Sequence, residues 1–243
     1  MKDKIEIIYE DRELVVCHKM PGTPVQTAKV GQLDMVSLLS NYFAGKKERT
    51  DIYIVHRLDQ PVEGIMVFAR TKQAAAALSR QSREKNMDKY YIALAEGIFE
   101  PSHGEFENYL LRDGKKNTSQ VVSKDTIGAK KAKLSFKVKK VWHPKKEPGK
   151  AGMLDNQEEN SLNVPISLLE IKLHTGRHHQ IRVQMAHAGH PLVGDKKYNP
   201  NCTAGYLPVG LCSVKLSFFH PGTGESMEFT VKPKGAAFSQ WEA

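Results

Sequence analysis

The sequence predicts an α+β fold with many strands and few helices. β-rich runs recur along the whole chain, whereas only three segments place apolar residues at helical spacing. The 243 residues are 40% apolar and 26% charged, the composition of a globular protein with a sizeable core. No internal repeat or break in the core-forming segments divides the chain, so we expect one unit over residues 1–243, with a cleft between two lobes.

Each expected helix has a start or stop signal beside its apolar positions, because Ser, Thr, Asp and Asn side chains cap helix N-termini and Gly closes C-termini. The three helices are Met35–Tyr42, with Asp34 as N-cap and Gly45 beyond its end; Lys72 to about Lys85, with Thr71 as N-cap; and Ile181–Ala188, closed by Gly189.

The β-rich runs are short and bounded by polar turns, and the first two predict a hairpin. The expected strands are Ile5–Tyr9, Leu14–His18, Ile52–Val55, Ile65–Ala69, Tyr90–Ala95, Gln120–Ser123, Leu134–Val141, Leu168–His174, Leu211–Phe218 and Met227–Val231. The segment His143–Pro165 has few large apolar residues and three prolines, so we expect a mobile loop there rather than a linker to a second domain.

Charge and cysteine content indicate a basic cytoplasmic protein. There are 36 Lys+Arg and 27 Asp+Glu, and 36 − 27 gives a net charge of +9. No stretch approaches the ~18 consecutive apolar residues of a membrane helix, and the charged N-terminus does not fit a signal peptide. The three cysteines have no CxxC spacing and fit a reducing compartment. A monomer is the expected oligomeric state.

Much of the positive charge lies between Lys130 and Lys150, where nine lysines accompany one acidic residue. Apolar residues alternate there with Lys133, Lys137 and Lys139, which places the lysines on one face of a strand. One interpretation is a solvated face that protects a sheet edge. The other is a surface for a polyanion, whose affinity falls steeply as salt rises. Charge alone leaves both open.

Two segments carry ionisable residues where chemistry is often placed. Asp59 follows a buried strand and precedes a proline, so its carboxylate either faces a cleft or satisfies local backbone amides. His56, in the same segment, is by itself typical of a structural histidine. Arg177 and Arg182 flank the start of the third helix, where a carboxylate or phosphate would be stabilised.

Two further groups of residues are ambiguous on their own. Adjacent tyrosines, Tyr90 and Tyr91, must face opposite sides of a strand, so one can enter a cleft while the other packs. Histidines suggest zinc at first sight, but they fall on different elements and lack a metal-binding motif. We therefore expect no metal. These histidines are His174, His178, His179, His187 and His190.

Taken in order, these segments resemble the RluA-type family of pseudouridine synthases, which isomerise selected uridines within structured RNA. The resemblance covers roughly Ile5–Pro233. Its motifs are IIYEDRELVVCHKMPGTPV (Ile7–Val25), HRLDQPVEG (His56–Gly64), KYYIALAEG (Lys89–Gly97), LHTGRHHQIRVQMAHAGHPLVGDKKY (Leu173–Tyr198) and LCSVKLSFFHPGTGE (Leu211–Glu225).

The resemblance implies a pseudouridine synthase fold, with a long mixed, mostly antiparallel sheet, a central catalytic cleft and few flanking helices. It implies that Asp59 is the catalytic aspartate, that Tyr91 stacks on the target base, and that Arg182 pairs with the aspartate. Neither a metal nor an organic cofactor is implied. The expected RNA-contacting residues are Arg57, which would fill the space left by the flipped nucleotide, His56, Arg177, Lys133, Lys137 and Lys139.

The sequence departs from the family pattern at two places. Val62-Glu63-Gly64 stands where the family has threonine-serine-glycine, and we expect Glu63 to add a negative charge near the site that alters RNA contacts or the ionisation of Asp59. Met20 is interposed between Lys19 and Pro21. We also expect no small N-terminal RNA-binding domain, so RNA affinity would depend on the sheet surface, with Lys130–Lys150 as the candidate contact.

These features predict an RNA pseudouridine synthase acting on ribosomal or transfer RNA. An alternative is a non-catalytic RNA-binding or ribosome-assembly factor on the same fold, which only the changed Val62-Glu63 segment supports. A second alternative is a metal-dependent hydrolase that uses the histidines. The sequence does not identify the target uridine. Nor does it decide whether the aspartate acts as a nucleophile or as a base at the sugar 2′ position.

Overall fold

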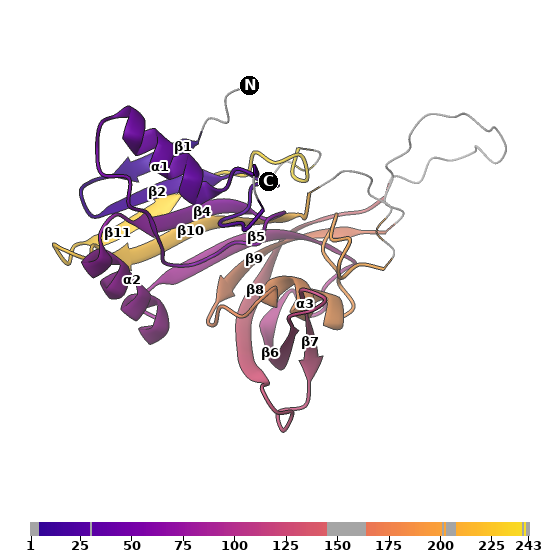
Figure 1. Ribbon diagram of the computed structural model, residues 1–243. Helices are drawn as coiled ribbons and strands as arrows, with labels where there is room; N and C mark the ends of the chain where they lie inside the picture. The colour runs from indigo at the N-terminus through magenta and orange to yellow at the C-terminus, as the bar shows by residue number, and fades with distance from the viewer. Residues whose placement is uncertain are drawn as a thin grey trace.

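One eleven-stranded sheet runs through the described part of the chain (Figure 1). The computed structural model describes residues 5–29, 31–144, 164–200, 202, 208–239 and 241. The strands are β1 Glu6–Glu10, β2 Leu14–Lys19, β3 Tyr53–Ile54, β4 Glu63–Ala69, β5 Asp88–Glu96, β6 His103–Asp113, β7 Thr118–Val122, β8 Lys130–Trp142, β9 Ile166–Leu173, β10 Leu211–Phe219 and β11 Ser226–Thr230. The helices are α1 Met35–Gly45, α2 Lys72–Glu84 and α3 Gln180–His187.

The sheet has the order β1-β2-β4-β10-β5-β9-β8-β6-β7, with β3 added to β4 and β11 added to β10. Every pairing is antiparallel except that of β4 with β10, where Glu63 lies opposite Cys212 and Gly64 opposite Ser213. The expected mixed, mostly antiparallel sheet with few helices is thus confirmed. The single parallel contact joins the N-terminal strands to the rest of the sheet.

Local sequence signals placed most elements correctly. The β1–β2 hairpin forms as expected, Asp34 Oδ1 accepts the Ser37 N–H at 2.8 Å, and Thr71 Oγ1 accepts the Ala74 N–H at 3.1 Å. These two caps fix the starts of α1 and α2. Strand β6 was not predicted, because glutamates at every second position weaken its β-propensity. Glu107 lies opposite Lys133 and Glu105 opposite Ser135, and the two glutamates form ion pairs with Lys131 and Lys133 of β8.

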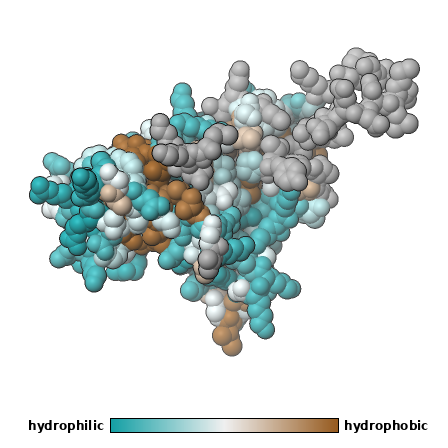
Figure 2. Space-filling model, turned by 45° about the horizontal axis from the view of Figure 1, so that its top comes forward, coloured by the Kyte–Doolittle hydropathy of each residue, from teal (hydrophilic) through white to brown (hydrophobic). Residues whose placement is uncertain are grey.

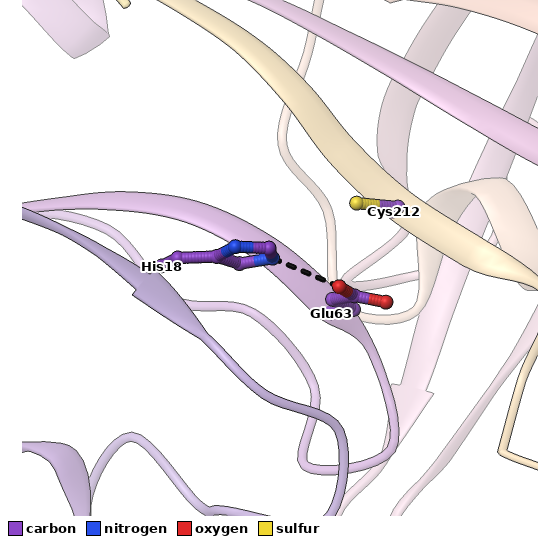
Figure 3. Close-up of side chains that lie close together, drawn as sticks. All are labelled: His18, Glu63 and Cys212. Atoms are coloured by element: carbon purple, nitrogen blue, oxygen red, sulfur yellow. Dashed lines mark ion pairs between the residues drawn. The ribbon is translucent and has the colours of Figure 1, made fainter. Parts of the chain in front are cut away.

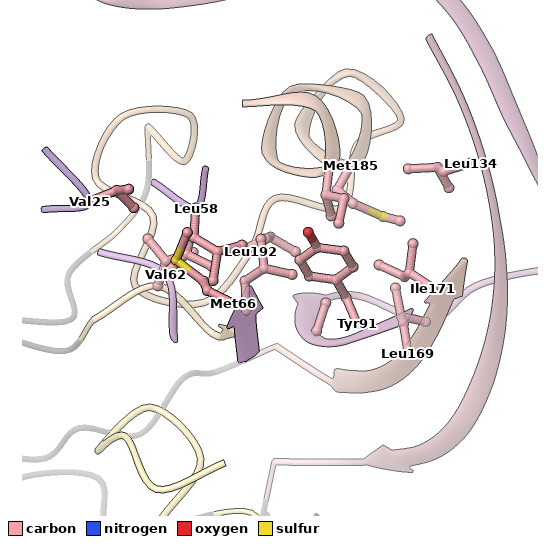
Figure 4. Close-up of a cluster of buried hydrophobic side chains, with 14 of the residues drawn as sticks. Val25, Leu58, Val62, Met66, Tyr91, Leu134, Leu169, Ile171, Met185 and Leu192 are labelled. Carbon is pink, nitrogen blue, oxygen red and sulfur yellow. The ribbon is translucent and has the colours of Figure 1, made fainter. Parts of the chain in front are cut away.

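The largest core cluster packs α1 and α3 against the sheet. Figure 4 shows Tyr91 of β5 beside Ile171 of β9, Leu134 of β8 and Met185 of α3. A second cluster fills the space between the sheet and α2. On the face in Figure 2, hydrophilic residues surround a hydrophobic band, and the lower projection ends in a hydrophobic tip. Ile127, in the turn between β7 and β8, is 96% exposed.

The predicted mobile loop, 143–165, lies for the most part outside the described residues, as do three of the nine lysines of Lys130–Lys150. No described helix has the length and apolar character needed to cross a bilayer. Cys17, Cys202 and Cys212 are all free thiols.

Gly64 is required by the close approach of β4 and β10. Its φ is +136°, and a Cβ atom there would lie 2.4 Å from the Ser213 nitrogen and 2.5 Å from its oxygen. Both atoms are backbone, so neither can swing away. Only glycine therefore allows the parallel contact between these strands.

We predict that Gly64→Ala lowers the free energy of unfolding by about 3 kcal/mol or more, because backbone strain adds to a backbone clash. Gly224→Ala is the matched control: its φ is +76°, but nothing lies within 4 Å of the added Cβ. The control should lose only about 1 kcal/mol. Urea unfolding of both variants measures the difference, and equal losses would contradict the steric explanation.

Candidate active site

Arg182 holds Asp59 in a fixed position. The guanidinium, 4% exposed on α3, donates from Nη1 to Asp59 Oδ2 at 2.8 Å. Its Nε and Nη2 donate to the two oxygens of Asp195, each at 2.7 Å. Burial opposes the charge on Arg182, but the hydrogen bonds and charge of Asp195 and the charge of Asp59 outweigh it and raise the pKa of the guanidinium. The arginine therefore stays a cation that cannot rotate.

Asp59 presents one carboxylate oxygen to its surroundings. The side chain is 24% exposed, and both Arg182 Nη1 and His179 Nε2, the latter at 3.6 Å, approach Oδ2. Within the described residues, Oδ1 has no hydrogen-bond partner. One oxygen is thus held and the other is available for chemistry.

Lys19 fixes the loop that carries Asp59 through hydrogen bonds to backbone carbonyls. The Lys19 ammonium donates to the carbonyl oxygens of Met20 at 3.1 Å and Gln60 at 3.0 Å, and the Gly22 N–H also donates to Gln60 O. Burial lowers the pKa of Lys19 to about 8, although the charges of Asp59 and Glu63 oppose this. Sequence reasoning missed Lys19; the available signal was a lysine at the end of an apolar strand. Met20, the interposed residue, supplies one of the bonded carbonyls.

Tyr91 lies close to this carboxylate but inside the core. Its side chain points to the α3 side of the sheet and is 5% exposed, as Figure 4 illustrates. Burial raises the pKa of the Tyr91 hydroxyl; the hydrogen bond to Ser213 opposes this rise, and the charge of Asp59 adds to it. Asp59, Tyr91 and Arg182 therefore converge on one place.

Two adjacent histidines complete the surroundings of Asp59. His179 Nδ1 lies 2.6 Å from the Tyr198 hydroxyl, which accepts the Ser119 N–H at 2.8 Å. The His178 ring stacks on that of His179 at 3.7 Å between centroids. Burial lowers the pKa of His179 to about 4, against the opposing charge of Asp59. From the sequence we assigned these two histidines no role beyond the rejected metal site. The signal that was missed is the position of His179 three residues before Arg182.

The remaining predicted site residues of the segments His56–Gly64 and Leu173–Tyr198 are Arg57, Arg177 and His56, and they differ in exposure. Arg57 is exposed. Arg177 is exposed too, and its Nε donates to the Lys131 carbonyl at 2.9 Å. His56 is half-buried, and its Nε2 accepts the Val67 N–H at 3.2 Å, so that nitrogen is already used within the protein. Burial, and then the charge of Lys89, lower the pKa of His56 well below the usual value and favour the neutral ring. An RNA contact of His56 stays a prediction.

The lysine face of β8 lies on the side of the sheet away from Tyr91. Phe136 pairs with Ile171 and Ile171 with Tyr91, so these share a face, whereas Lys137 pairs with Glu170 on the other. The face also carries five ion pairs, which neutralise most of its charge. They are Lys131–Glu107, Lys133–Glu105, Lys139–Glu170, Lys172–Asp88 and Lys215–Glu228. The expectation that Lys133, Lys137 and Lys139 contact the RNA is not supported by this position.

Glu63 is a structural residue, contrary to the expectation that its charge acts on the site. It is 1% exposed, and its two oxygens accept the backbone N–H groups of Lys234 at 2.6 Å and Gly235 at 2.8 Å. His18 Nε2 lies 2.9 Å from Oε1 (Figure 3). Burial opposes ionisation, but these contacts outweigh it and lower the pKa of Glu63. The carboxylate therefore fixes the C-terminal segment to β4.

The histidines of the segment Leu173–Tyr198 do not converge on a metal site. His174 Nε2 bonds Ser135 Oγ at 3.0 Å, whereas His190 bonds the Glu96 carbonyl and stacks on Phe99. In the part of the chain that is described, three or more potential metal ligands gather only at His18, Glu63 and Cys212 (Figure 3). There the carboxylate oxygens already hold backbone N–H groups.

Known proteins are similar to this chain in sequence and in fold. Residues 13–187 match the RNA pseudouridylate synthase family. The chain is 32% identical over 196 residues to the uncharacterized RNA pseudouridine synthase YhcT of Bacillus subtilis, covering 80% of this chain but 58% of that protein. It is 30% identical over 235 residues to the dual-specificity RNA pseudouridine synthase RluA of Haemophilus influenzae, covering 94% and 93%. Human RNA pseudouridylate synthase domain containing 1 has the same fold, with a TM-score of 0.72 at 21% identity over 95% of this chain and 84% of that one.

We predict that Glu63→Gln lowers the free energy of unfolding at pH 7 by about 1–3 kcal/mol, because the charged acceptor of the Lys234 and Gly235 N–H groups is lost. The contacts of the folded state hold the pKa of Glu63 below its usual value of 4.5, so its contribution is present above that pH and is lost as pH falls through the folded pKa. The difference between variant and wild type should therefore shrink below about pH 4.5. Urea unfolding from pH 3 to 7 tests this, with Glu105→Gln on the sheet surface as control. A variant that is as stable as the wild type but defective in catalysis would show instead that Glu63 acts on the Asp59 site.

Proposed function

This chain belongs to the RluA-type family of RNA pseudouridine synthases, and we propose that it isomerises specific uridines in structured ribosomal or transfer RNA. The observation that carries the proposal is the half-held carboxylate of Asp59, with Oδ2 on Arg182 at 2.8 Å and Oδ1 open. A positioned carboxylate beside an aromatic ring is what the isomerisation requires. The three free cysteines fit a reducing compartment, and we place the activity in the cytoplasm.

The target nucleotide must leave the helix before it can react. A stacked uridine hides the carbon that forms the new bond, and extruding it costs a few kcal/mol. Arg57 is exposed two residues before Asp59. Its planar cation can stack in the gap and offset part of that cost. We propose that Arg57 occupies the space that the flipped nucleotide vacates.

Asp59 Oδ1 then acts on the extruded nucleotide. It attacks the sugar or base as a nucleophile, or it removes a proton from the sugar 2′ position. Either route breaks the glycosidic bond, after which the base rotates and a carbon–carbon bond forms. Arg182 stabilises the negative charge of Asp59 through a charge-assisted hydrogen bond, and a lysine could not also hold Asp195 bidentately. We propose that Tyr91, which is 5% exposed beside the site, supplies a π surface once the extruded base enters.

The RNA backbone is proposed to lie along the turn between β6 and β7, on the site side of the protein. Lys115 and Lys116 are exposed in this turn, and Lys197 donates to the carbonyl of Asn117 at 2.8 Å. Asn117 also contacts His178, next to the Asp59 site. No described carboxylate forms an ion pair with these three lysines, in contrast to the lysine face of β8. They are therefore better suited to phosphate contacts.

The non-catalytic alternative loses its support. It depended on Glu63 replacing a serine next to the catalytic segment, and Glu63 is turned toward His18 and the C-terminal segment. Asp59, Tyr91 and Arg182 are all present. We therefore favour catalysis over simple RNA binding.

We predict that Asp59→Asn reduces pseudouridine formation by about a thousandfold or more, because the amide cannot act as nucleophile or base. RNA affinity should change little, since phosphate contacts dominate it. Product is measured by mapping pseudouridine in total RNA treated with purified protein, and affinity by filter binding. Asp125→Asn, in the β7–β8 turn, is the matched control and should stay active. A fully active Asp59→Asn protein would contradict the proposed function.

We predict that replacing Lys115, Lys116 and Lys197 together by Gln weakens RNA binding and lowers the slope of log affinity against log salt by about 2–3. The matched control replaces Lys133, Lys137 and Lys139, which should leave the slope nearly unchanged because their face is turned away from the site and two of them are in ion pairs. Binding titrations from 50 to 200 mM salt provide the comparison. The reverse pattern would restore the β8 surface as the RNA contact.

A further inference from the structure

The proton arrangement on His179 follows from its neighbours. The Tyr198 oxygen already accepts the Ser119 N–H at 2.8 Å, so its own proton is directed at another acceptor. His179 Nδ1, at 2.6 Å, is placed to be that acceptor. Because a neutral imidazole carries one proton, donation by Tyr198 to Nδ1 requires the proton on Nε2. In this arrangement Tyr198 selects the tautomer of His179.

This Nε2–H is directed at Asp59. The distance from Nε2 to Asp59 Oδ2 is 3.6 Å, and Arg182 Nη1 binds the same oxygen at 2.8 Å. Hydrogen bonds at catalytic groups are often long in a free enzyme and shorten when substrate binds. Both nitrogens approach Oδ2, Arg182 as a hydrogen-bond donor and His179 from a longer distance, and neither is given to Oδ1.

The backbone supports a specific role for His179. Its φ is +54° and its ψ is +26°, a left-handed conformation that is unfavourable for a non-glycine residue, and its side chain makes no cap hydrogen bond to α3. Strain of this kind persists where the surroundings hold the residue, commonly at functional sites. Here the stacked ring of His178 and the Tyr198 hydroxyl hold it.

The charges around His179 favour its neutral form. Burial is the main cause of its low pKa of about 4, and the cations Arg182 and Lys197 act in the same direction. Asp59 opposes them. The groups that face it are Asp59 from the catalytic loop, Arg182 and His178 from α3 and its approach, and Lys197 and Tyr198 from the turn after α3.

We propose that Tyr198 and His179 are positioning residues, which hold Asp59 Oδ2 through a neutral Nε2–H imidazole so that Oδ1 alone faces the target nucleotide. The inference rests on the proposed function, because it assigns these residues to the reaction of Asp59. Neither residue need touch the substrate. A purely structural pair would fill the same space without requiring one tautomer.

Histidine NMR of the free protein tests the hydrogen-bond chain without any assay of activity. In protein labelled with nitrogen-15 histidine, His179 should be neutral with the proton on Nε2 from pH 5.5 to 8. Tyr198→Phe should raise the pKa of His179, because Nδ1 loses the donor that stabilises the neutral ring. A proton on Nδ1, or an imidazolium at pH 7 in the wild type, would overturn the inference.

Single-turnover kinetics test the role in the reaction. Tyr198→Phe keeps the ring beneath Arg182, whose guanidinium carbon lies 5.1 Å from the ring centroid, and Asn tolerates the left-handed backbone at position 179. Tyr198→Phe and His179→Asn should each slow pseudouridine formation about tenfold or more, with RNA affinity within about twofold. Tyr109→Phe on β6 is the control, and thermal unfolding checks that each variant is folded.

The outcomes separate the two proposals. An active wild type with Tyr198→Phe within twofold of its rate would overturn the positioning role. An inactive wild type would overturn the proposed function, whereas the NMR result would still decide whether the chain from Tyr198 to Asp59 exists.

Discussion

The buried guanidinium of Arg182 is the interaction on which the site depends. Removing a charge from water is costly, and here the cost is offset by two carboxylates that together fill three of its N–H groups. Asp195 is fully buried and bonds the arginine and the backbone of its own turn, while Asp59 keeps part of its surface in solvent. Because Asp195 already balances the cation, Asp59 adds a second negative charge that burial alone would not favour. That excess charge is what a reaction can use.

The same contact also joins distant parts of the chain. Asp59 lies on the N-terminal side of the sheet and Arg182 on a helix against its other half, 123 residues later in sequence. Among the described strands, the pairing that joins the two halves of the sheet is the short parallel contact of β4 with β10, which depends on Gly64. Lys19 and Glu63 then fix the loops on either side of that junction. The largest hydrophobic cluster continues across the junction, so these polar contacts add position and orientation to a packed core.

Much of this arrangement could be predicted from the sequence, and the reasons differ from residue to residue. Asp34 and Thr71 are N-caps whose side chains accept the N–H three residues later, so local sequence was enough to place the starts of α1 and α2. Asp59 and Arg182 were selected because several motifs occurred together. The orientation of Glu63 could not be predicted because it depends on Gly235, 172 residues away. The role of Tyr198 depends on its hydrogen bond with Ser119 of β7, and no sequence pattern around either residue predicts that contact.

The ladder of lysine–carboxylate pairs on the outer face of the sheet has an effect beyond its own strands. Since those ion pairs cancel locally, the net charge of +9 is carried by other residues, which include Lys115, Lys116 and Lys197 near the β6–β7 turn. Such a molecule has an electrostatic dipole. A polyanion that approaches within about a Debye length, ~10 Å at 0.1 M salt, exerts a torque on it before any contact forms. Encounters are thereby biased toward the reactive orientation, and the neutral outer face reduces unproductive capture.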